Sequence, residues 1–417
     1  YGRARRSLPL LSRAVLLDPA GRPRPVAPGE QIEAIDGTRV LFPREAAARP
    51  AAERLAARQR DWLASGRVPG GGSPHGPMVR LALLDLLTLL SDQGACVAGW
   101  APYWRYVWPR DSAFVAVALA RTGHPAQARS ILAFLQRVQP EHGLFQARYR
   151  PDASGPPDHR GIQVDGVGWA LWATAEVLGQ LPSASEREDA AAALRDLVRR
   201  STDAVLRSIS SPSGLPPVSP DYWEVPEREL TLGTAAPLLT GLRSAVLVHS
   251  WAGDARRAEA ARRGAQRLAE TLRDAFAPAY GRHPRDTARS RDAALAFLLP
   301  PFAPTADPLI VRAWRDSAAR MRRPNGGLAP GARWPRDGIA WTPQTSLYAL
   351  TAACLGDSAD ATSRLNWLDR HRTDLGALPE KVLHDGRPAS VAPLTWTAAC
   401  VVLAALALED GFVPVRP

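Results

Sequence analysis

The run Phe114-Val115-Ala116-Val117-Ala118-Leu119 decides the fold, because it is apolar on every side of the helix that it predicts. A helix without a polar face must be buried all round. Two further runs have the same character, Trp169-Ala170-Leu171-Trp172-Ala173 and Cys400-Val401-Val402-Leu403-Ala404-Ala405-Leu406. Segments such as Glu186 to Arg200 and Asp254 to Asp274 instead mix apolar and charged positions and need one face in water. The sequence therefore predicts buried helices and half-exposed helices.

Apolar periodicity, with Pro, Gly and Asp as punctuation, predicts twelve helical segments in which half-exposed and buried helices alternate along the chain. Buried helices would form an inner ring and half-exposed helices an outer ring. The predicted fold class is therefore all-α, an (α/α)6 barrel of six inner and six outer helices with a short N-terminal extension. The predicted segments are 78–93, 110–122, 125–138, 164–179, 185–209, 232–250, 252–277, 289–299, 306–322, 342–355, 358–372 and 392–409.

The chain divides near residue 75 into an N-terminal extension that is partly β (1–75) and the catalytic barrel (76–417). The extension is rich in Pro, Gly and Arg, with β-like runs at Ala14 to Leu17 and Thr38 to Phe42 and a helix near 50–65. Its end is the linker Gly70-Gly71-Gly72-Ser73-Pro74.

The composition is that of a large globular protein of 417 residues with a net charge of +11. Lys381 is the sole lysine, and the arginines are spread over the polar faces of predicted helices. A nucleic-acid surface would be a basic cluster interleaved with aromatic residues. No nucleic-acid partner is therefore expected.

The sequence predicts no metal site, no cofactor and no membrane span. The cysteines Cys96, Cys354 and Cys400 lack metal-ligand spacing, and no stretch approaches the roughly 18 apolar residues of a membrane helix. The start, Tyr1 to Leu17, is basic and then apolar, but Arg13 interrupts it, which makes a poor signal peptide. The chain does not begin with Met, so a removed leader is left open, and a cytoplasmic or a secreted bacterial location both fit.

Long loops precede the predicted inner helices and should meet at one end of the barrel, where long loops often carry function. Before the second helix runs Tyr103-Trp104-Arg105-Tyr106-Val107-Trp108-Pro109-Arg110-Asp111. Aromatic rings can stack on the C–H face of a sugar while an Arg/Asp pair binds its hydroxyl groups. Asp111 could also cap the helix, with Pro109 ahead of it, and both roles could hold because a cap does not use both carboxylate oxygens.

Similar groups precede other inner helices. Gln163 and Asp165 lie before the fourth helix, where they could cap it or face a cavity. Arg333-Trp334-Pro335-Arg336-Asp337 and Trp341 precede the tenth helix, and Trp396 starts the twelfth. The pair Arg291-Asp292 is interpreted as structural.

Two glutamates are candidate catalytic groups. Glu224 ends Pro220-Asp221-Tyr222-Trp223-Glu224, and a carboxyl group against aromatic walls loses hydration, which raises its pKa as a general acid needs. The alternative is a helix-start Glu beside a packed Trp. Glu380, before the twelfth helix, would lie opposite Glu224 in a six-membered ring, although it could also be a surface residue paired with Lys381.

Two carboxyl groups that flank an aromatic-walled pocket are the minimum for glycoside hydrolysis. A separation of roughly 6.5–9.5 Å leaves room for a water molecule and gives inversion at the anomeric carbon.

At these loops the chain resembles glycoside hydrolase family 15, the glucoamylase family, from about residue 78 to 410. The resemblance implies that Glu224 is the general acid, that Glu380 is the general base, and that Arg110 and Asp111 hold the terminal sugar. The motifs that carry it are Val107-Trp108-Pro109-Arg110-Asp111, Asp165-Gly166, Tyr222-Trp223-Glu224, Arg333-Trp334-Pro335-Arg336-Asp337, Leu378-Pro379-Glu380 and Pro393-Leu394-Thr395-Trp396.

The chain departs from the family in three ways. Val225 stands where members often have a second acidic residue, the N-terminal β-sandwich of prokaryotic members is replaced by about 75 residues, and no starch-binding domain follows. These departures favour a short substrate such as isomaltose or a small malto- or isomalto-oligosaccharide over starch.

The expected activity is an inverting, exo-acting hydrolase that releases glucose from the non-reducing end of short α-glucosides, without a cofactor. Alternatives are a trehalase or a phosphorolytic enzyme on the same barrel, or a non-catalytic sugar-binding barrel. Oligomeric state stays open. The expected substrate-binding residues are Trp108, Arg110, Asp111, Tyr106, Gln163, Asp165, Tyr222, Trp223, Arg333, Trp334, Asp337, Trp341 and Trp396.

Overall fold

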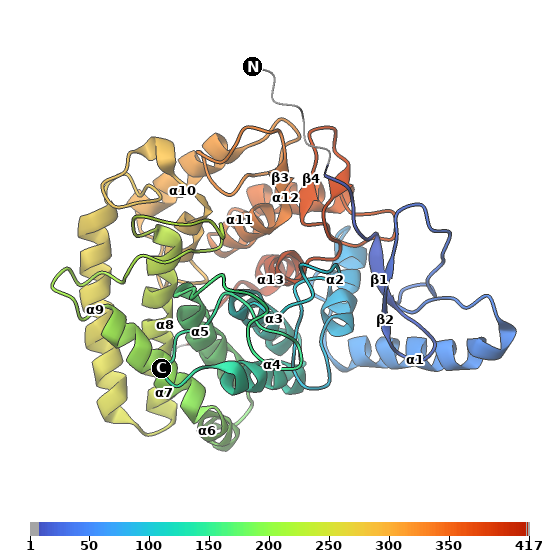
Figure 1. Cartoon of the computed structure of the whole chain (residues 1–417), viewed down its shortest axis with the longest axis horizontal. Helices are drawn as coiled ribbons and strands as arrows, with labels where there is room; N and C mark the ends of the chain where they lie inside the picture. The colour runs from blue at the N-terminus through green and yellow to red at the C-terminus, as the bar shows by residue number, and fades with distance from the viewer. Residues whose placement is uncertain (1–7, 414, 416–417) are drawn as a thin grey trace.

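The computed structural model describes residues 8–413 and Val415, and helices dominate it (Figure 1). The α-helices are α1 Arg49–Ser65, α2 Gly76–Thr88, α3 Pro109–Arg121, α4 Pro125–Val138, α5 Asp165–Gly179, α6 Ala184–Ala193, α7 Arg195–Ser208, α8 Leu232–Trp251, α9 Ala255–Phe276, α10 Pro308–Met321, α11 Thr342–Cys354, α12 Ser358–Arg370 and α13 Thr395–Asp410. The 3-10 helices are η1 Ala46–Ala48, η2 Ala288–Ser290 and η3 Ala293–Leu298. The short strands are β1 Ala14–Leu17, β2 Pro23–Val26, β3 Ala340–Trp341, β4 Lys381–Val382 and β5 Pro388–Ala389.

The buried helices form a closed inner ring. Going round it, α3 packs on α5, α5 on α8, α8 on η3, η3 on α11, α11 on α13, and α13 returns to α3. Nearly every residue of α5 and α13 is buried, as their lack of a polar face predicts. The ring confirms the (α/α)6 barrel.

An outer layer covers this ring, and most inner helices pack on a helix that comes soon after them in the chain. Thus α4 covers α3, α7 covers α5, α9 covers α8, α10 covers η3 and α12 covers α11, while α2 closes the layer against α13 (Figure 1). Short turns join α3 to α4 and α11 to α12: Gly123 and Gly356 in these turns take φ values of +89° and +78°, which favour glycine.

Two predicted helices are wrong in part. The segment predicted over 185–209 is split at Leu194 into α6 and α7, where no Pro or Gly marks the break. The segment predicted over 289–299 contains only η2 and η3, because Asp292 caps η3 from its side chain and Pro300-Pro301 follows. Prolines lack the N–H that would continue a helix. One inner position of the ring is therefore short.

Two other predicted helices have different ends in the structure. The segment predicted over 78–93 ends at Thr88, and the one predicted to begin at 392 begins at Thr395, beyond Pro393. Proline disfavours helical backbone in the residue before it, which accounts for the later start of α13.

Helices α5 and α8 approach each other backbone to backbone at two glycines. A Cβ atom on Gly168 would lie 2.2 Å from the carbonyl oxygen of Pro237, and one on Gly241 would lie 2.6 Å from the Cα of Gly168. A larger residue at either place would push the helices apart. This contact fixes the relative position of the loops that enter α5 and α8.

The N-terminal part packs against the barrel through a buried ion pair. Arg39 donates to Asp85 of α2 through Nε at 2.5 Å and through NH2 at 2.8 Å, and both side chains are buried. The predicted strand β1 pairs antiparallel with β2, but 38–42 forms only isolated bridges, Leu17 with Val40 and Ala34 with Leu41. The predicted helix near 50–65 is α1.

The chain just before β1 runs beside the loop that follows β5. The Leu11 N–H donates to the Ser390 oxygen at 2.7 Å, and the Ser390 N–H donates to the Pro9 oxygen at 3.0 Å. Ser12 Oγ donates to the Ala392 oxygen at 2.6 Å. The predicted poor signal peptide over 1–17 falls partly outside the described residues, since 1–7 are not among them.

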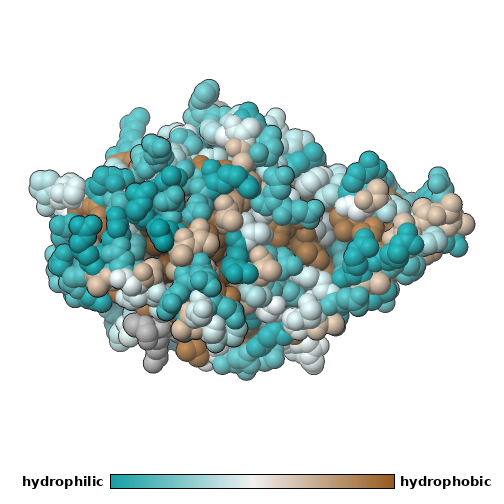
Figure 2. All heavy atoms as spheres, turned by 90° about the horizontal axis from the view of Figure 1, so that it is seen from below, coloured by the Kyte–Doolittle hydropathy of each residue, from teal (hydrophilic) through white to brown (hydrophobic). Residues whose placement is uncertain are grey.

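The surface seen from below is mainly hydrophilic, with apolar side chains in small groups (Figure 2). Among the described residues, no helix is long and apolar enough to cross a membrane.

Candidate active site

Arg110 is the centre of a buried charged cluster at the start of α3. Its guanidinium lies 3.4 Å from Asp111, 3.5 Å from Asp165 and 3.9 Å from Glu224. It also donates to Gln163 Oε1 at 3.5 Å. These residues come from the first turns of α3 and α5 and from the loops before α5 and α8, so these three predicted positions do meet at one end of the ring.

Neither Asp111 nor Asp165 caps its helix. Trp108 and Val164 hold the N-cap positions, without a side-chain cap hydrogen bond. The capping alternative for Asp111 is therefore wrong, and so are the capping alternatives for Gln163 and Asp165. All three side chains lie against Arg110 instead.

Burial sets the ionisation of the two aspartates. It raises the pKa of Asp111 to about 6, against the opposing effect of Arg110, and the charges of Glu224 and Glu380 raise it further. The pKa of Asp165 is likewise raised to about 6, chiefly by burial and in spite of Arg110. Because both glutamates act on Asp111, they lie within electrostatic reach of one group.

Glu224 has both aromatic and cationic neighbours. Trp108 Nε1 donates to its Oε1 at 2.5 Å, and Arg160 forms an ion pair with its Oε2. The prediction of an aromatic wall thus describes only part of the environment, because Arg110 and Arg160 also face this carboxylate.

The backbone at Glu224 is held in an unusual conformation. Its φ is +53°, in the left-handed region that residues other than glycine seldom adopt. Asp221 holds the turn: its carbonyl accepts from the Glu224 N–H at 2.8 Å, and its Oδ1 accepts from the Trp223 N–H at 2.9 Å. Such backbone strain costs about 1–3 kcal/mol and clusters at functional sites.

Glu380 lies in the loop before α13 and is held by four neighbours. Ser390 Oγ donates to its Oε2 at 2.5 Å, Lys381 Nζ lies 3.2 Å from the same atom, and Trp104 Nε1 donates to Oε1 at 3.4 Å. The Glu380 N–H donates to the Val391 oxygen at 2.8 Å. The predicted pairing with Lys381 exists, but the side chain is only 13% exposed, so Glu380 is not a free surface residue.

Aromatic residues connect the surroundings of the two glutamates by two routes. Trp104 and Trp108, which contact Glu380 and Glu224 respectively, belong to the same loop. On the other route three rings pack edge to face in a row. The ring centroids of Trp223 and Trp334 are 4.8 Å apart, and those of Trp334 and Trp341 are 5.3 Å apart. Lys381 then lies 4.2 Å over the Trp341 ring.

A small sheet fixes this second route. Strand β3 pairs antiparallel with β4, so that Trp341 faces Lys381, and β4 pairs with β5. The loops before α11 and α13 are thereby joined at the residue next to Glu380.

Several predicted binding residues lie elsewhere. Tyr222 is buried under the site, with its hydroxyl donating to the Pro330 oxygen at 3.1 Å and its ring against Trp396 at 6.2 Å. Trp396 is also buried, 5.0 Å below the Arg110 guanidinium. Arg333 and Asp337 are exposed, and the structure does not bring either of them to Arg110 among the described contacts.

Tyr106 lies at the edge of the site. Its ring packs edge to face on Trp108 at 6.5 Å, and Arg148 lies 4.5 Å over it.

Three site residues were not selected from the sequence: Trp104, Arg160 and Ser390. Trp104 and Arg160 lie in the same loops as selected residues, and only their position in a long loop before an inner helix could have indicated them. Ser390 could not be recognised in the sequence, because its backbone is held by hydrogen bonds to Pro9 and Leu11, which are distant in the chain.

A second ionic cluster supports the turn at Glu224. Arg282 is bound to Asp221 at 2.9 Å, Glu227 at 2.5 Å and Asp292 at 2.7 Å, and lies 3.8 Å over the Trp223 ring. Asp292 therefore has a structural role, as predicted.

The described residues contain no group of three or more His, Cys, Asp or Glu side chains that could hold a metal ion.

Comparison with solved structures gives the class of fold. A glycosidase variant in complex with glucose superposes with a TM-score of 0.67 at 20% identity, over 79% of this chain and 96% of that one. A bacterial glucoamylase complexed with acarbose gives a TM-score of 0.68 at 16% identity, over 88% of this chain and 59% of that one. The fold is thus the helical barrel of glucoamylases.

Sequence comparison is more limited. No family model matches the chain. An uncharacterized glycosyl hydrolase of Methanocaldococcus jannaschii is 31% identical over 98 residues, which are 23% of this chain and 16% of that protein. The chain thus spans about a sixth of the curated relative it matches. Together, these likenesses support the resemblance to glycoside hydrolase family 15.

Proposed function

We propose that this protein is an inverting, exo-acting glycoside hydrolase that releases glucose from the non-reducing end of short α-glucosides. Glu224 acts as the general acid and Glu380 as the general base. The observation that carries the proposal is that Glu224 lies 3.9 Å from the buried Arg110, while the charges of both Glu224 and Glu380 raise the pKa of Asp111.

The reaction needs two groups on opposite faces of the sugar. Glu224 gives its proton to the glycosidic oxygen as the bond from the anomeric carbon to that oxygen breaks. Glu380 removes a proton from a water molecule, whose oxygen attacks the anomeric carbon from the other face. Ser390 and Lys381 both lie at Oε2 of Glu380, and they orient the carboxylate.

Unpaired polar atoms in the cluster support a sugar ligand. Arg110 Nε, Asp111 Oδ2 and Asp165 Oδ1 are buried and have no hydrogen-bond partner among the described residues. Buried polar groups are normally paired, so atoms left without a partner indicate positions for ligand atoms. A sugar ring offers hydroxyl groups that can both donate to the two carboxylates and accept from the guanidinium.

The aromatic row supports a second sugar. Trp223, Trp334 and Trp341 are only partly buried and form a row of rings that begins beside Glu224. Aromatic faces stack on the apolar faces of sugars without fixing the linkage. The charged cluster thus takes the terminal sugar and the tryptophan row takes the next one.

The experiment is a panel of α-glucosides with the purified protein, with glucose release as the measurement. The panel holds isomaltose, maltose, trehalose and longer malto-oligosaccharides, each with and without phosphate. Release from isomaltose or maltose without phosphate supports the proposal. Release that needs phosphate, or that occurs with trehalose alone, supports one of the two alternatives instead.

A matched preparation of the double variant Glu224→Gln/Glu380→Gln serves as the blank for contaminating hydrolases. Saturable sugar binding with no turnover of any substrate would mean a sugar-binding barrel, and would contradict the proposed activity.

A further inference from the structure

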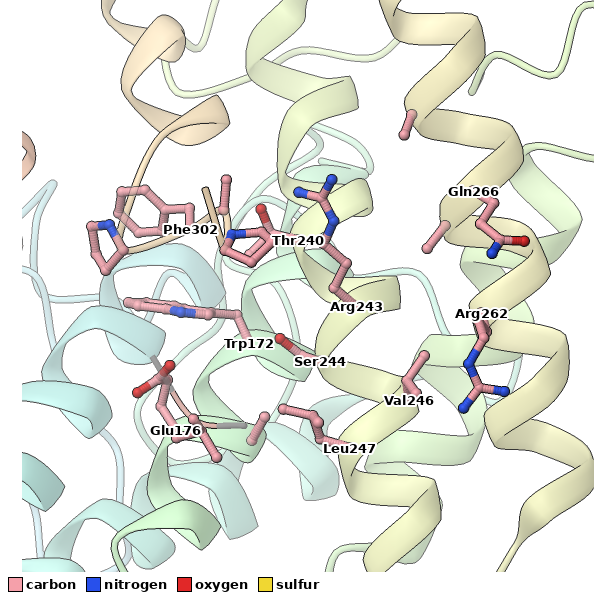
Figure 3. A pocket seen from close by; sticks show the side chains of 17 residues that line it. Trp172, Glu176, Thr240, Arg243, Ser244, Val246, Leu247, Arg262, Gln266 and Phe302 are labelled. Carbon is pink, nitrogen blue, oxygen red and sulfur yellow. The ribbon is translucent and has the colours of Figure 1, made fainter. Parts of the chain in front are cut away.

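A cavity of about 450 Å³ lies between α5, α8, α9 and the loop that follows η3 (Figure 3). Its walls are mostly apolar: Trp172 comes from α5, Leu247 from α8, Ala265 and Ala269 from α9, and Phe302 from the loop. The volume is within the range of roughly 300–1,000 Å³ that is usual for small-molecule sites.

This cavity is separate from the charged cluster. Trp172 lies midway along α5 and Arg243 just past the middle of α8, whereas the charged cluster lies at the N-terminal ends of the inner helices. At about 1.5 Å per residue, Trp172 is about 10 Å along α5 from Asp165. No lining residue of the cavity belongs to the candidate active site.

The short inner helix accounts for this space. Helix η3 ends at Leu298, and Pro301, Phe302, Ala303 and Pro304 line the cavity where a longer inner helix would continue. The wall at this position is therefore a loop.

Arg243 places a cation in this apolar setting without an acidic partner. The described contacts include no hydrogen bond or ion pair to its guanidinium, and burial lowers its pKa without a compensating carboxylate. The acid that lines this cavity, Glu176, is already bound by Arg121, whose Nε lies 2.9 Å from its Oε2. Figure 3 shows the Glu176 carboxylate and the Arg243 guanidinium on opposite sides of the Trp172 ring.

A second unpaired donor lines the same cavity. Trp172 is buried, and its Nε1 has no hydrogen-bond partner among the described residues. Both of these groups without a partner are donors, so an acceptor on a ligand could pair with them. Arg243 is half-buried, and a carboxylate pairs with a guanidinium through two parallel hydrogen bonds.

We propose that the cavity binds an amphipathic carboxylate of medium chain length. The carboxylate accepts from Arg243, and the alkyl chain lies against Trp172, Leu247 and Phe302. The walls supply apolar contact along the chain, whereas the rim residues Arg262 and Gln266 are exposed. This site is separate from the proposed hydrolase activity, and its test does not depend on turnover.

The test is calorimetric titration of the full chain with octanoate, with Arg243→Met as the main variant. We expect saturable binding of one octanoate per chain, and a Kd that is about tenfold or more higher in the variant, since a hydrogen bond to a charged group is lost. Arg263→Met is the matched control. Arg263 lies exposed on α9 and pairs with Glu259, so this variant should bind octanoate as the original protein does.

Two further measurements keep the proposal open to contradiction. Ala269→Trp fills the cavity while Arg243 stays in place, so it should abolish binding even if Arg243→Met proves unstable. Octanol and octylammonium have the same alkyl chain but lack the carboxylate, so both should bind at least tenfold more weakly.

Absence of octanoate binding would overturn the proposal, and so would equal affinity for octanol or octylammonium. Sedimentation with and without octanoate gives the remaining outcome. If the chain self-associates through this face and Arg243→Met abolishes the association, a second copy covers the cavity and the proposed ligand is wrong.

Discussion

The buried Arg110 and the half-buried Arg243 have opposite electrostatic surroundings. At the loop end, Arg110 has Asp111, Asp165 and Glu224 around it. In the cavity between α5, α8 and α9, Arg243 has no hydrogen bond or ion pair among the described residues, and the walls are mostly apolar. The helical shell is common to both sites, so the difference comes from the segments that enter and leave the inner helices. Reaction chemistry is therefore expected at the loop end alone.

The largest expected effect is at the two glutamates. Glu224→Gln and Glu380→Gln keep the shape of each side chain but remove its capacity to transfer a proton. Each should lower kcat by about 10²–10⁴-fold, the usual contribution of a general acid or base. Steady-state glucose release checks this.

Glu229→Gln is the control for both glutamate variants, because Glu229 is an exposed residue between Glu224 and α8. A comparable loss of rate in this control would contradict the assignment of the two catalytic groups.

A smaller effect is expected at Arg110. Arg110→Met should lower kcat/KM by about 10–100-fold, because charged hydrogen bonds to a substrate hydroxyl are lost. Arg110→Lys keeps the charge but loses the forked geometry, so its loss should be intermediate. An unchanged kcat/KM in folded Arg110→Met would show that the charged cluster does not bind substrate.

A pH-dependent effect on stability is expected at Asp165. Its pKa is about 6 in the folded chain, above the ordinary value of 3.8, because of burial. Between pH 4 and 6 the unfolded chain therefore releases a proton that the folded chain keeps, so the free energy of unfolding falls as pH rises. The fall is on the order of 1–3 kcal/mol, at about 1.4 kcal/mol for each unit of pKa difference.

Asp165→Asn cannot titrate and should lack this fall. Thermal unfolding at pH 4 and pH 7 measures it: the variant should gain stability relative to the original chain as pH rises. The difference in stability between the variant and the original chain at pH 4 measures the contacts that the substitution removes. If this difference were the same at pH 7, the prediction would be wrong.

The smallest effect is expected when the cavity at Arg243 is changed. Arg243→Met should leave kcat/KM for the α-glucoside within about twofold, because sites without shared partners act independently. A large loss of kcat/KM in this folded variant would show that the two sites are coupled.

The ring could be predicted from the sequence because a helix that is buried on all sides is apolar at nearly every position. Runs such as 114–119 and 400–406 are apolar all round, and they did become inner helices. The short inner position at η3 was not foreseen, although Pro300-Pro301 marks where it stops. The break at Leu194 leaves no comparable mark.

The site was predicted only in part, because loops have no period. Glu224, Arg110 and Asp165 could be selected because each is a charged residue in a segment that precedes or begins an inner helix. Arg160 and Ser390 could not be found in that way. Their partners Glu224 and Glu380 are 64 and 10 residues away in the chain, and Ser390 also depends on the distant N-terminal segment.

The central claim is that Glu224 and Glu380 act from opposite faces of one sugar. The most direct test is proton NMR of the anomer first released from an α-glucoside, recorded before mutarotation. The account predicts β-glucose, because water aided by Glu380 attacks from the face opposite the leaving group. Release of α-glucose would contradict it.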